Sequence, residues 1–213
     1  MRRVLFHCDD YIKGGLVNRH LRDIRSLYQN PSRLRENQAS KFRKLLSHAI
    51  RTTQFYSGYT ENTQLADIPV LSKHLLRSRQ AEVLSSAYSG ENLPTVGTSG
   101  SYNVRITFYL SPEKKARRSA EVIHFNTAVG YQVGMRYALV NGRSTAKKTP
   151  FECFKQNEVV ISLPALTERA LEAACLRLLQ GDIRLVIGWP SIMGPVARHL
   201  TQTGRKLNGI KAV

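Results

Sequence analysis

The sequence predicts an α/β fold, in which N-terminal helices precede βαβ units that form a parallel or mostly parallel sheet. Two observations predict it. An amphipathic helical pattern with a basic face follows Asn30-Pro31, and in the last third of the chain short apolar runs alternate with capped helical patterns. The chain has 213 residues, 42% of them hydrophobic, so it can form a packed core as one large domain or two small ones.

The N-terminal part begins without a clear pattern and then becomes helical. Residues 1–36 show no clean periodicity, but Asn30 and Pro31 predict a helix start, as its cap and its first residue. His48 lies beside the apolar stripe of this helix, and we expect it to be structural. The stripe consists of apolar residues at helical spacing, with lysines and arginines on the other face: Phe42, Leu45, Leu46, Ala49 and Ile50.

The middle of the chain predicts short elements around a polar loop. Pro69 breaks the chain, and Ser72 is expected to cap a short helix that runs to about Leu84. A loop rich in serine and glycine follows over residues 85–101. Residues 104–110 alternate as in a strand, and Pro112 begins the next helix.

The last third predicts strand, helix, strand, helix and the start of a third strand. The strands are expected at 159–164, 183–189 and 209–213. Thr167 and Gly181 cap and end the first helix, and Gly204 ends the second. This alternation is typical of βαβ units in a parallel sheet, whose ligands bind at the C-terminal ends of the strands.

We expect a mainly helical region over residues 1–90 and the α/β portion of a larger domain over residues 91–213. The last predicted strand stops at Val213, which indicates that this domain is truncated at its C-terminus.

The formal net charge of +17 is the strongest compositional feature. It favours polyanionic partners such as nucleic acid, anionic lipid or nucleotide phosphates. The basic residues are spread along the chain, and no RNA-binding aromatic signature, zinc finger or helix-turn-helix pattern organises them. No apolar run approaches the roughly eighteen residues of a membrane span, and Asp9 and Asp10 interrupt the N-terminal apolar run, so we expect a cytoplasmic protein.

The cysteines and histidines predict no metal site and no catalytic group. Cys8, Cys153 and Cys175 are too few and too widely spaced for a disulfide framework or a zinc site, and Cys175 is expected to be a small core residue. The histidines have no ligand spacing: His7, His20, His74, His124 and His199.

The segment "TSGS" at residues 98–101 has the composition of a loop whose backbone approaches phosphate. Gly100 would let an anion reach the backbone, and hydroxyl side chains on either side would donate hydrogen bonds. The segment lacks the Gly-Lys-Ser/Thr of a Walker loop, which disfavours a P-loop NTPase. We expect this loop at the mouth of the parallel sheet.

Four segments in order carry a resemblance to a known family: "LLSHAIRTTQFY", "IPVLSKHLLR", "TSGS" and "GWPS". From about residue 38 onward the chain resembles the adenylate-forming (AMP-binding) superfamily, in its phenylacetate–CoA ligase and CapK-like capsular polysaccharide biosynthesis branch. The resemblance implies an incomplete adenylate-forming N-terminal domain. The implied reaction activates a small carboxylate with Mg-ATP to an acyl adenylate, releases pyrophosphate, and passes the acyl group to a thiol such as CoA or to another acceptor.

The resemblance also implies roles for two groups of residues. The ATP phosphates would contact the hydroxyl-bearing and glycine residues of the loop and a basic residue after it: Thr98, Ser99, Gly100, Ser101 and Arg105. The acyl substrate would lie near the second turn, formed by Gly188, Trp189, Pro190 and Ser191. An alternative interpretation makes Trp189 a core aromatic residue and Pro190 an ordinary first helical residue.

The sequence departs from the family pattern in two ways. Tyr102 and Asn103 stand where the family continues with Thr-Gly, and the motifs for adenine, magnesium, ribose and the catalytic lysine are not present. We therefore expect the N-terminal part of a ligase, inactive alone, which is either a truncated gene product or half of a split enzyme whose partner is a separately encoded C-terminal half. Two alternatives stay open: a basic, non-catalytic module that binds nucleic acid or an anionic membrane, and a decayed remnant.

Overall fold

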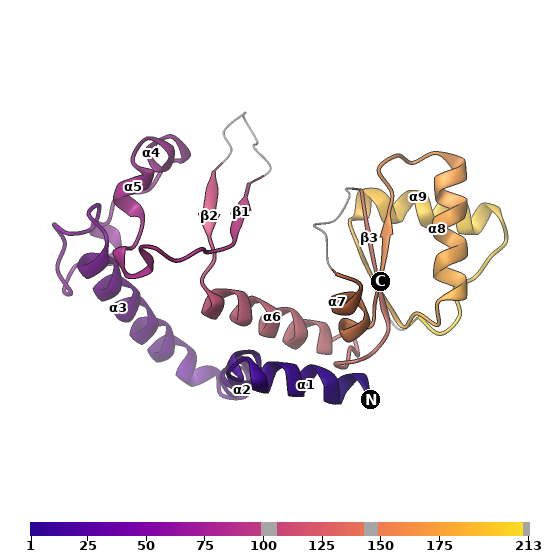
Figure 1. The fold of residues 1–213 in the computed structure, drawn as a ribbon, viewed down its shortest axis with the longest axis horizontal. Helices are drawn as coiled ribbons and strands as arrows, with labels where there is room; N and C mark the ends of the chain where they lie inside the picture. Colours follow the sequence, from indigo (N-terminus) through magenta and orange to yellow (C-terminus); the bar gives the residue numbers. More distant parts are fainter. Residues whose placement is uncertain (99–105, 143–148, 211–213) are drawn as a thin grey trace. The chain divides into compact units, whose positions relative to one another are not determined.

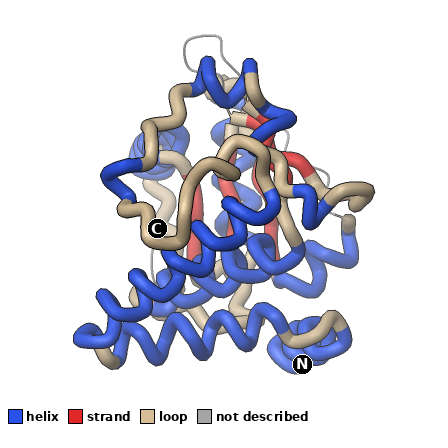
Figure 2. The backbone as a smooth tube through the Cα atoms, turned by 90° about the vertical axis from the view of Figure 1, so that its left-hand side faces the viewer, coloured by secondary structure: helices blue, strands red, loops and turns tan. Residues whose placement is uncertain are grey.

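The computed structural model describes residues 1–98, 106–142 and 149–210. The chain divides into two compact units: unit 1 comprises Met1–Arg22 and Arg117–Val213, and unit 2 comprises Asp23–Ala116. Helices make up most of the described chain (Figure 2), and unit 1 contains a parallel sheet, which confirms the predicted α/β class. The predicted boundary between residues 90 and 91 falls inside unit 2.

The sheet of unit 1 has three parallel strands in the order β4-β3-β5. They are β3 (Tyr137–Asn141), β4 (Glu158–Ser162) and β5 (Leu185–Gly188). The predicted strands at 159–164 and 183–189 are confirmed as β4 and β5 with different ends. The central strand β3 was not predicted, and it pairs with both of the others, so the connection from β4 to β5 crosses over it.

Three helices alternate with these strands: α7 (Pro150–Gln156), α8 (Glu168–Gln180) and α9 (Pro190–Gln202). The predicted cap of α8 is confirmed, because Thr167 accepts a hydrogen bond from the Ala170 amide at 3.4 Å. Gly204, just after α9, adopts φ +66°, a conformation that favours glycine and ends the helix there.

The core of unit 1 lies between one face of the sheet and the helices α8 and α9. In Figure 1, α7 and α8 lie on opposite sides of the sheet. Cys175 is 0% exposed in this core, which confirms its predicted place. The residues that form this core cluster are Ala138, Val140, Ile161, Leu163, Ala174, Cys175, Leu178, Ile183, Val186, Ile192, Val196 and Leu200.

The chain begins with two helices that were not predicted: α1 (Arg2–Ile12) and α2 (Leu16–Gln29). Gly14 and Gly15 turn the chain between them with φ of +90° and +67°. The buried carboxylate of Asp10 accepts hydrogen bonds from the amides of Val17 and Asn18, both at 3.0 Å, and so caps the start of α2.

The helical part of unit 2 follows the prediction closely. The 3₁₀ turn η1 (Pro31–Arg33) begins at Pro31 as predicted and leads into α3 (Leu34–Thr52), but the predicted cap is wrong, because the Asn30 side chain donates to the Ser26 carbonyl at 3.2 Å and makes no capping hydrogen bond. Leu46 of the predicted stripe is buried, whereas Leu45 is 66% exposed. His48 lies 3.1 Å from the Ser85 hydroxyl, as a structural residue would.

The rest of unit 2 consists of short elements. They are η2 (Leu65–Asp67), α4 (Lys73–Ser78), α5 (Gln80–Val83), η3 (Ser86–Tyr88), β1 (Thr95–Gly97), β2 (Thr107–Tyr109) and the start of α6 (Pro112–Thr127). The Ser72 cap is confirmed by the hydrogen bond from the Leu75 amide at 3.1 Å. The single helix predicted up to Leu84 is interrupted at Arg79, where the backbone leaves helical geometry.

Two further expectations concern the ends of the chain and its surroundings. Gly209 and Ile210 are not part of a strand, and residues 211–213 of the third predicted strand lie outside the described residues. Among the helices that the structure describes, none combines the length and apolarity that crossing a membrane requires.

Candidate functional site

The predicted phosphate loop connects two antiparallel strands. β1 pairs with β2 in register from Thr95 opposite Tyr109 to Gly97 opposite Thr107. The Thr98 amide donates to the Ile106 carbonyl at 2.9 Å, and the Ile106 amide donates to the Thr98 hydroxyl oxygen at 3.2 Å. These two hydrogen bonds close the base of the loop. Ser99, Gly100, Ser101 and Arg105 lie outside the described residues.

The expected position of this loop in the sheet has to be corrected. β1 and β2 form a two-stranded sheet of their own in unit 2, whereas the parallel strands belong to unit 1. The loop is therefore not one of the turns that follow the parallel strands. Strand 95–97 was not predicted. Its three residues, Thr95, Val96 and Gly97, are all exposed, so they show no alternation of buried apolar and exposed polar side chains.

Thr98 has hydrogen-bonding capacity left for a ligand. Its hydroxyl oxygen accepts from the Ile106 amide, and among the described residues no acceptor for its own O–H is present. A hydroxyl group can donate one hydrogen bond while it accepts another. This hydrogen bond orients the Thr98 side chain through the backbone of Ile106, just before β2.

A groove of about 830 Å³ lies beside the same hairpin, entirely within unit 2. Residues of α4, α5, η3, β2 and the start of α6 line it, and most of them are apolar or aromatic. The aromatic rings are those of Tyr56, Tyr88, Phe108 and Tyr109, and Lys114 and Glu91 are its charged residues. Burial raises the pKa of Tyr56 above its ordinary value, which keeps this phenol a neutral donor.

The groove was not predicted from the sequence, because its walls come from segments far apart in the chain. The only part of the groove that the sequence indicated was the run of apolar residues at β2, which was predicted as an ordinary strand. Gln80 fixes the two walls against each other, since its side chain donates to the Thr107 carbonyl at 3.2 Å. Strand β2 thus forms a wall of the groove and also the stem of the loop.

The second predicted group of residues lies at the C-terminal end of β5, where α9 begins. Pro190 is the first residue of α9, and Trp189 precedes it with 70% of its surface exposed. The interpretation of Trp189 as a core aromatic residue is therefore wrong, and that of Pro190 as a first helical residue is confirmed. Ser191 is also exposed, in the first turn of α9.

Close packing around the end of β5 requires glycine at position 188. A Cβ atom built there would lie 2.7 Å from Cγ and Sδ of Met193 and 3.1 Å from the Val140 carbonyl. β5 and α9 can approach each other this closely only because residue 188 is glycine. Asn141 ends β3 at the same edge of the sheet, and its buried Oδ1 has no hydrogen-bond partner among the described residues.

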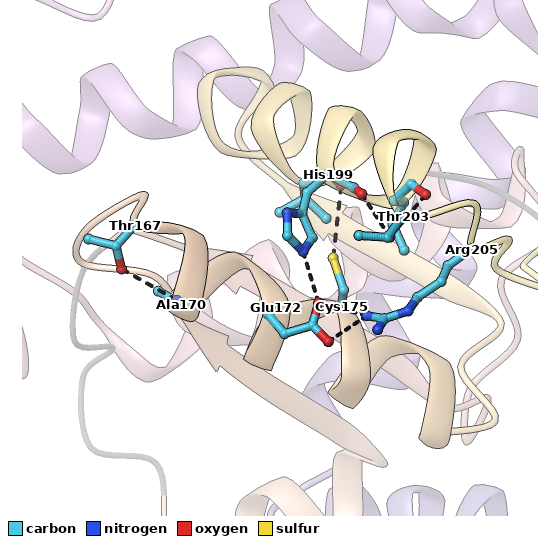
Figure 3. A network of polar contacts seen from close by, with 9 residues as sticks. Thr167, Ala170, Glu172, Cys175, His199, Thr203 and Arg205 are labelled. Carbon is cyan, nitrogen blue, oxygen red and sulfur yellow. Dashed lines mark hydrogen bonds and ion pairs between the residues drawn. The ribbon is translucent and has the colours of Figure 1, made fainter.

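A polar network in unit 1 resembles a catalytic group but joins two helices. In Figure 3, Glu172 of α8 lies between His199 of α9 and Arg205. His199 Nε2 is 2.9 Å from the carboxylate, and Arg205 Nη1 lies 2.7 Å from both of its oxygens. The hydrogen bond with His199, and next those with Arg205, lower the pKa of Glu172 below its ordinary value.

Nothing in this network is prepared for covalent chemistry. The Cys175 thiol faces the Val196 carbonyl at 3.9 Å, and burial raises its pKa above the ordinary value, which disfavours the nucleophilic thiolate. Among the described residues no group of three or more histidine, cysteine, aspartate or glutamate side chains could hold a metal ion. We interpret the network as a clamp between α8 and α9.

The comparisons with known proteins add no relative. No protein-family model matches the chain, and no curated protein matches it.

Proposed function

We propose that this chain binds the phosphates of ATP in a carboxylate-activating ligase of the phenylacetate–CoA ligase and CapK-like type. The observation that carries the proposal is the hairpin stem, in which Thr98 and Ile106 close a loop that contains hydroxyl residues and a glycine. A rigid stem of this kind holds donors at a fixed distance from an anion, so less entropy is lost on binding.

In this proposal the Thr98 hydroxyl donates to a phosphate oxygen while the backbone of β2 holds it in place. Ser99, Ser101 and Arg105 add donors, and Gly100 lets the backbone approach. The reaction in which they would take part transfers the AMP group of ATP to a substrate carboxylate and releases pyrophosphate, before the acyl group passes to CoA or another acceptor. The donors stabilise the negative charge on the departing pyrophosphate.

The residues at the end of β5 are proposed to meet the acyl substrate through the exposed ring of Trp189. An exposed indole next to the first turn of a helix offers an apolar surface to an aromatic or acyl group. Gly188 contributes by letting α9 pack closely, and Pro190 and Ser191 begin the helix.

The magnesium of the implied reaction has no ready protein ligands in the part of the chain that the structure describes, since that part holds no carboxylate cluster. Mg²⁺ commonly keeps several waters and binds through substrate phosphates. We therefore assign the metal to the ATP itself and derive no step of the chain's residues from it.

Equilibrium dialysis with Mg-ATP tests the proposal. Thr98→Val removes the donating hydroxyl and keeps the branched shape, so the dissociation constant should rise about tenfold to a hundredfold, the effect of one hydrogen bond to a charged group. Thr98→Ser keeps the hydroxyl and should bind nearly as the parent chain does. Thr95→Val on the exposed part of β1 is the matched control and should change nothing.

If Thr98→Val unfolds, it will bind Mg-ATP more weakly whether or not the Thr98 hydroxyl contacts a phosphate. Circular dichroism of each variant therefore accompanies the dialysis, and Thr98→Ala, which also removes the hydroxyl, replaces Thr98→Val if the latter unfolds. A parent chain that does not bind Mg-ATP, or a folded Thr98→Val chain that binds it equally well, refutes the proposal.

A further inference from the structure

Helix α1 packs on the rest of unit 1 through the side that carries its charged residues. Asp9 binds Lys155 of α7 at 2.7 Å, and Arg2 donates to the Phe154 carbonyl at 3.2 Å and to the Asn157 side chain. Asp10, on the same side, caps α2. These contacts fix which way α1 is rotated about its axis.

The opposite side of α1 is apolar and open to solvent. Phe6 lies on the inward side and is half-buried, but with 3.6 residues per turn the other apolar residues of α1 and its N-cap fall within an arc of about 120°. They are highly exposed: Met1 90%, Val4 62%, Leu5 41%, Tyr11 82% and Ile12 83%, with the exposed Cys8 between them. We call these six residues the α1 stripe.

This rotation is the reverse of what a helix in a globular protein normally adopts. A surface helix usually turns its apolar stripe toward the core and its charges toward water. Here the hydrogen bonds and ion pairs of Arg2, Asp9 and Asp10 hold the charged side inward. A contiguous exposed apolar surface of this kind marks a site of interaction.

The charges around the α1 stripe identify the occupant. Arg3 is exposed near one end of α1 and Lys13 at the other. Asp9 lies beside the stripe, but Lys13 and Lys155 share its charge. The charges of these four residues are therefore net positive, within a chain of net charge +17.

We propose that α1 is an interfacial helix, which lies in the plane of an anionic bilayer with the α1 stripe in the headgroup and acyl boundary. Apolar burial and the attraction of basic residues to anionic lipid act together in such helices. A net positive charge beside an exposed apolar face is complementary to anionic lipid, so the charges favour lipid. The inference does not depend on ATP binding.

Flotation of the full chain with vesicles tests this proposal. We expect binding to vesicles of phosphatidylcholine mixed with phosphatidylserine, much weaker binding to phosphatidylcholine alone, and loss of binding as salt is raised. The double variant Val4→Gln/Ile12→Gln should bind about a hundredfold more weakly, because two apolar side chains no longer enter the bilayer. Val70→Gln removes a residue that is 93% exposed but lies outside the stripe, and should bind like the parent chain.

Alkylation of the thiols locates the contact. Cys8 lies within the stripe and is exposed, whereas Cys153 is half-buried and Cys175 is buried. Anionic vesicles should slow the alkylation of Cys8 and leave that of Cys153 unchanged. Both variants change exposed positions, so their circular dichroism should match that of the parent chain.

Three results would overturn the proposal. The first is no flotation with anionic vesicles at low salt. The second is flotation that Val4→Gln/Ile12→Gln and Val70→Gln weaken equally, or that leaves Cys8 as reactive as before. The third is a dimer in sedimentation experiments that the double variant abolishes while lipid binding is absent, since the occupant would then be a second copy of the chain.

Discussion

Substituting Gly188 by alanine tests how unit 1 packs at the edge where the parallel strands end. The new Cβ would meet Met193 Cγ and Sδ at 2.7 Å and the Val140 carbonyl at 3.1 Å. The methionine side chain can swing away, but the carbonyl belongs to the neighbouring strand β3 and cannot move without disturbing the sheet. Overpacking of this kind costs about 1–3 kcal/mol of the free energy of unfolding.

Gly194, six residues further along in α9, provides the matched control. A Cβ at that position would meet only the end of the flexible Arg198 side chain, at 3.7 Å. Alanine loses less backbone freedom than glycine in a helix, but Pro195 follows, and its Cδ disfavours helical geometry for a preceding residue that carries a Cβ. Gly194→Ala should therefore leave the free energy of unfolding within about 0.5 kcal/mol of the parent value. The same chemical change thus costs stability at one position and little at the other.

Urea unfolding followed by circular dichroism measures both variants. We expect Gly194→Ala and the parent chain to be about equally stable, and Gly188→Ala to be less stable than both. If Gly188→Ala is as stable as the parent chain, residue 188 has free space around it, and the argument that close packing requires glycine is wrong.

The remaining predictions concern charge, a helix cap and the exposed indole. His199 and Arg205 lower the pKa of Glu172 in the folded chain, so the stability that Glu172 contributes is complete above the unfolded pKa of about 4.3 and is lost as the pH falls through the folded pKa. In Glu172→Gln the free energy of unfolding should therefore fall less steeply at acid pH than it does in the parent chain. Asp10→Ala should lower the free energy of unfolding by about 1–3 kcal/mol in urea, since it removes the cap of α2; an unchanged midpoint would contradict the cap. Trp189→Ala should leave stability within about 0.5 kcal/mol and weaken the binding of aromatic carboxylates in a fluorescence-free dialysis assay; unchanged binding would remove Trp189 from the proposed acyl site.

The elements that were predicted well carry a local signal. Thr167 begins α8 and Gly204 follows α9, and both act through hydrogen bonds or backbone angles that depend on one or two residues. The strands β4 and β5 were visible because each is a short apolar run next to such a cap. Local chemistry of this kind can be read without knowing the fold.

The elements that were missed depend on the rest of the chain. β3 is the central strand, and although Gly134, at φ +89°, and Gly142 flank its apolar run, that run was not assigned to a strand; its place between β4 and β5 follows from pairing alone. Helix α1 was missed because the helical spacing of its apolar residues was not recognised within residues 1–36. The pattern alone does not show that these residues face outward while the charged residues are bound inward.

The candidate site was predicted in part for the same reasons. The composition of residues 98–101 indicated a loop, and the stem formed by Thr98 and Ile106 agrees with a loop there. The antiparallel hairpin and its separation from the parallel sheet depend on the pairing of β1 with β2. The groove depends in addition on the packing of α4 and α5. The spacing of residues in the sequence does not show either contact.

A two-dimensional ¹H–¹⁵N NMR titration with Mg-ATP tests the central claim most directly. The proposal requires that the amide resonances of Thr98 and Ile106 shift with saturation, together with those of the adjoining strand residues, and that folded Thr98→Val needs about tenfold to a hundredfold more Mg-ATP to reach half of these shifts. Saturable shifts that leave Thr98 and Ile106 unmoved, or no shifts at all, would contradict it.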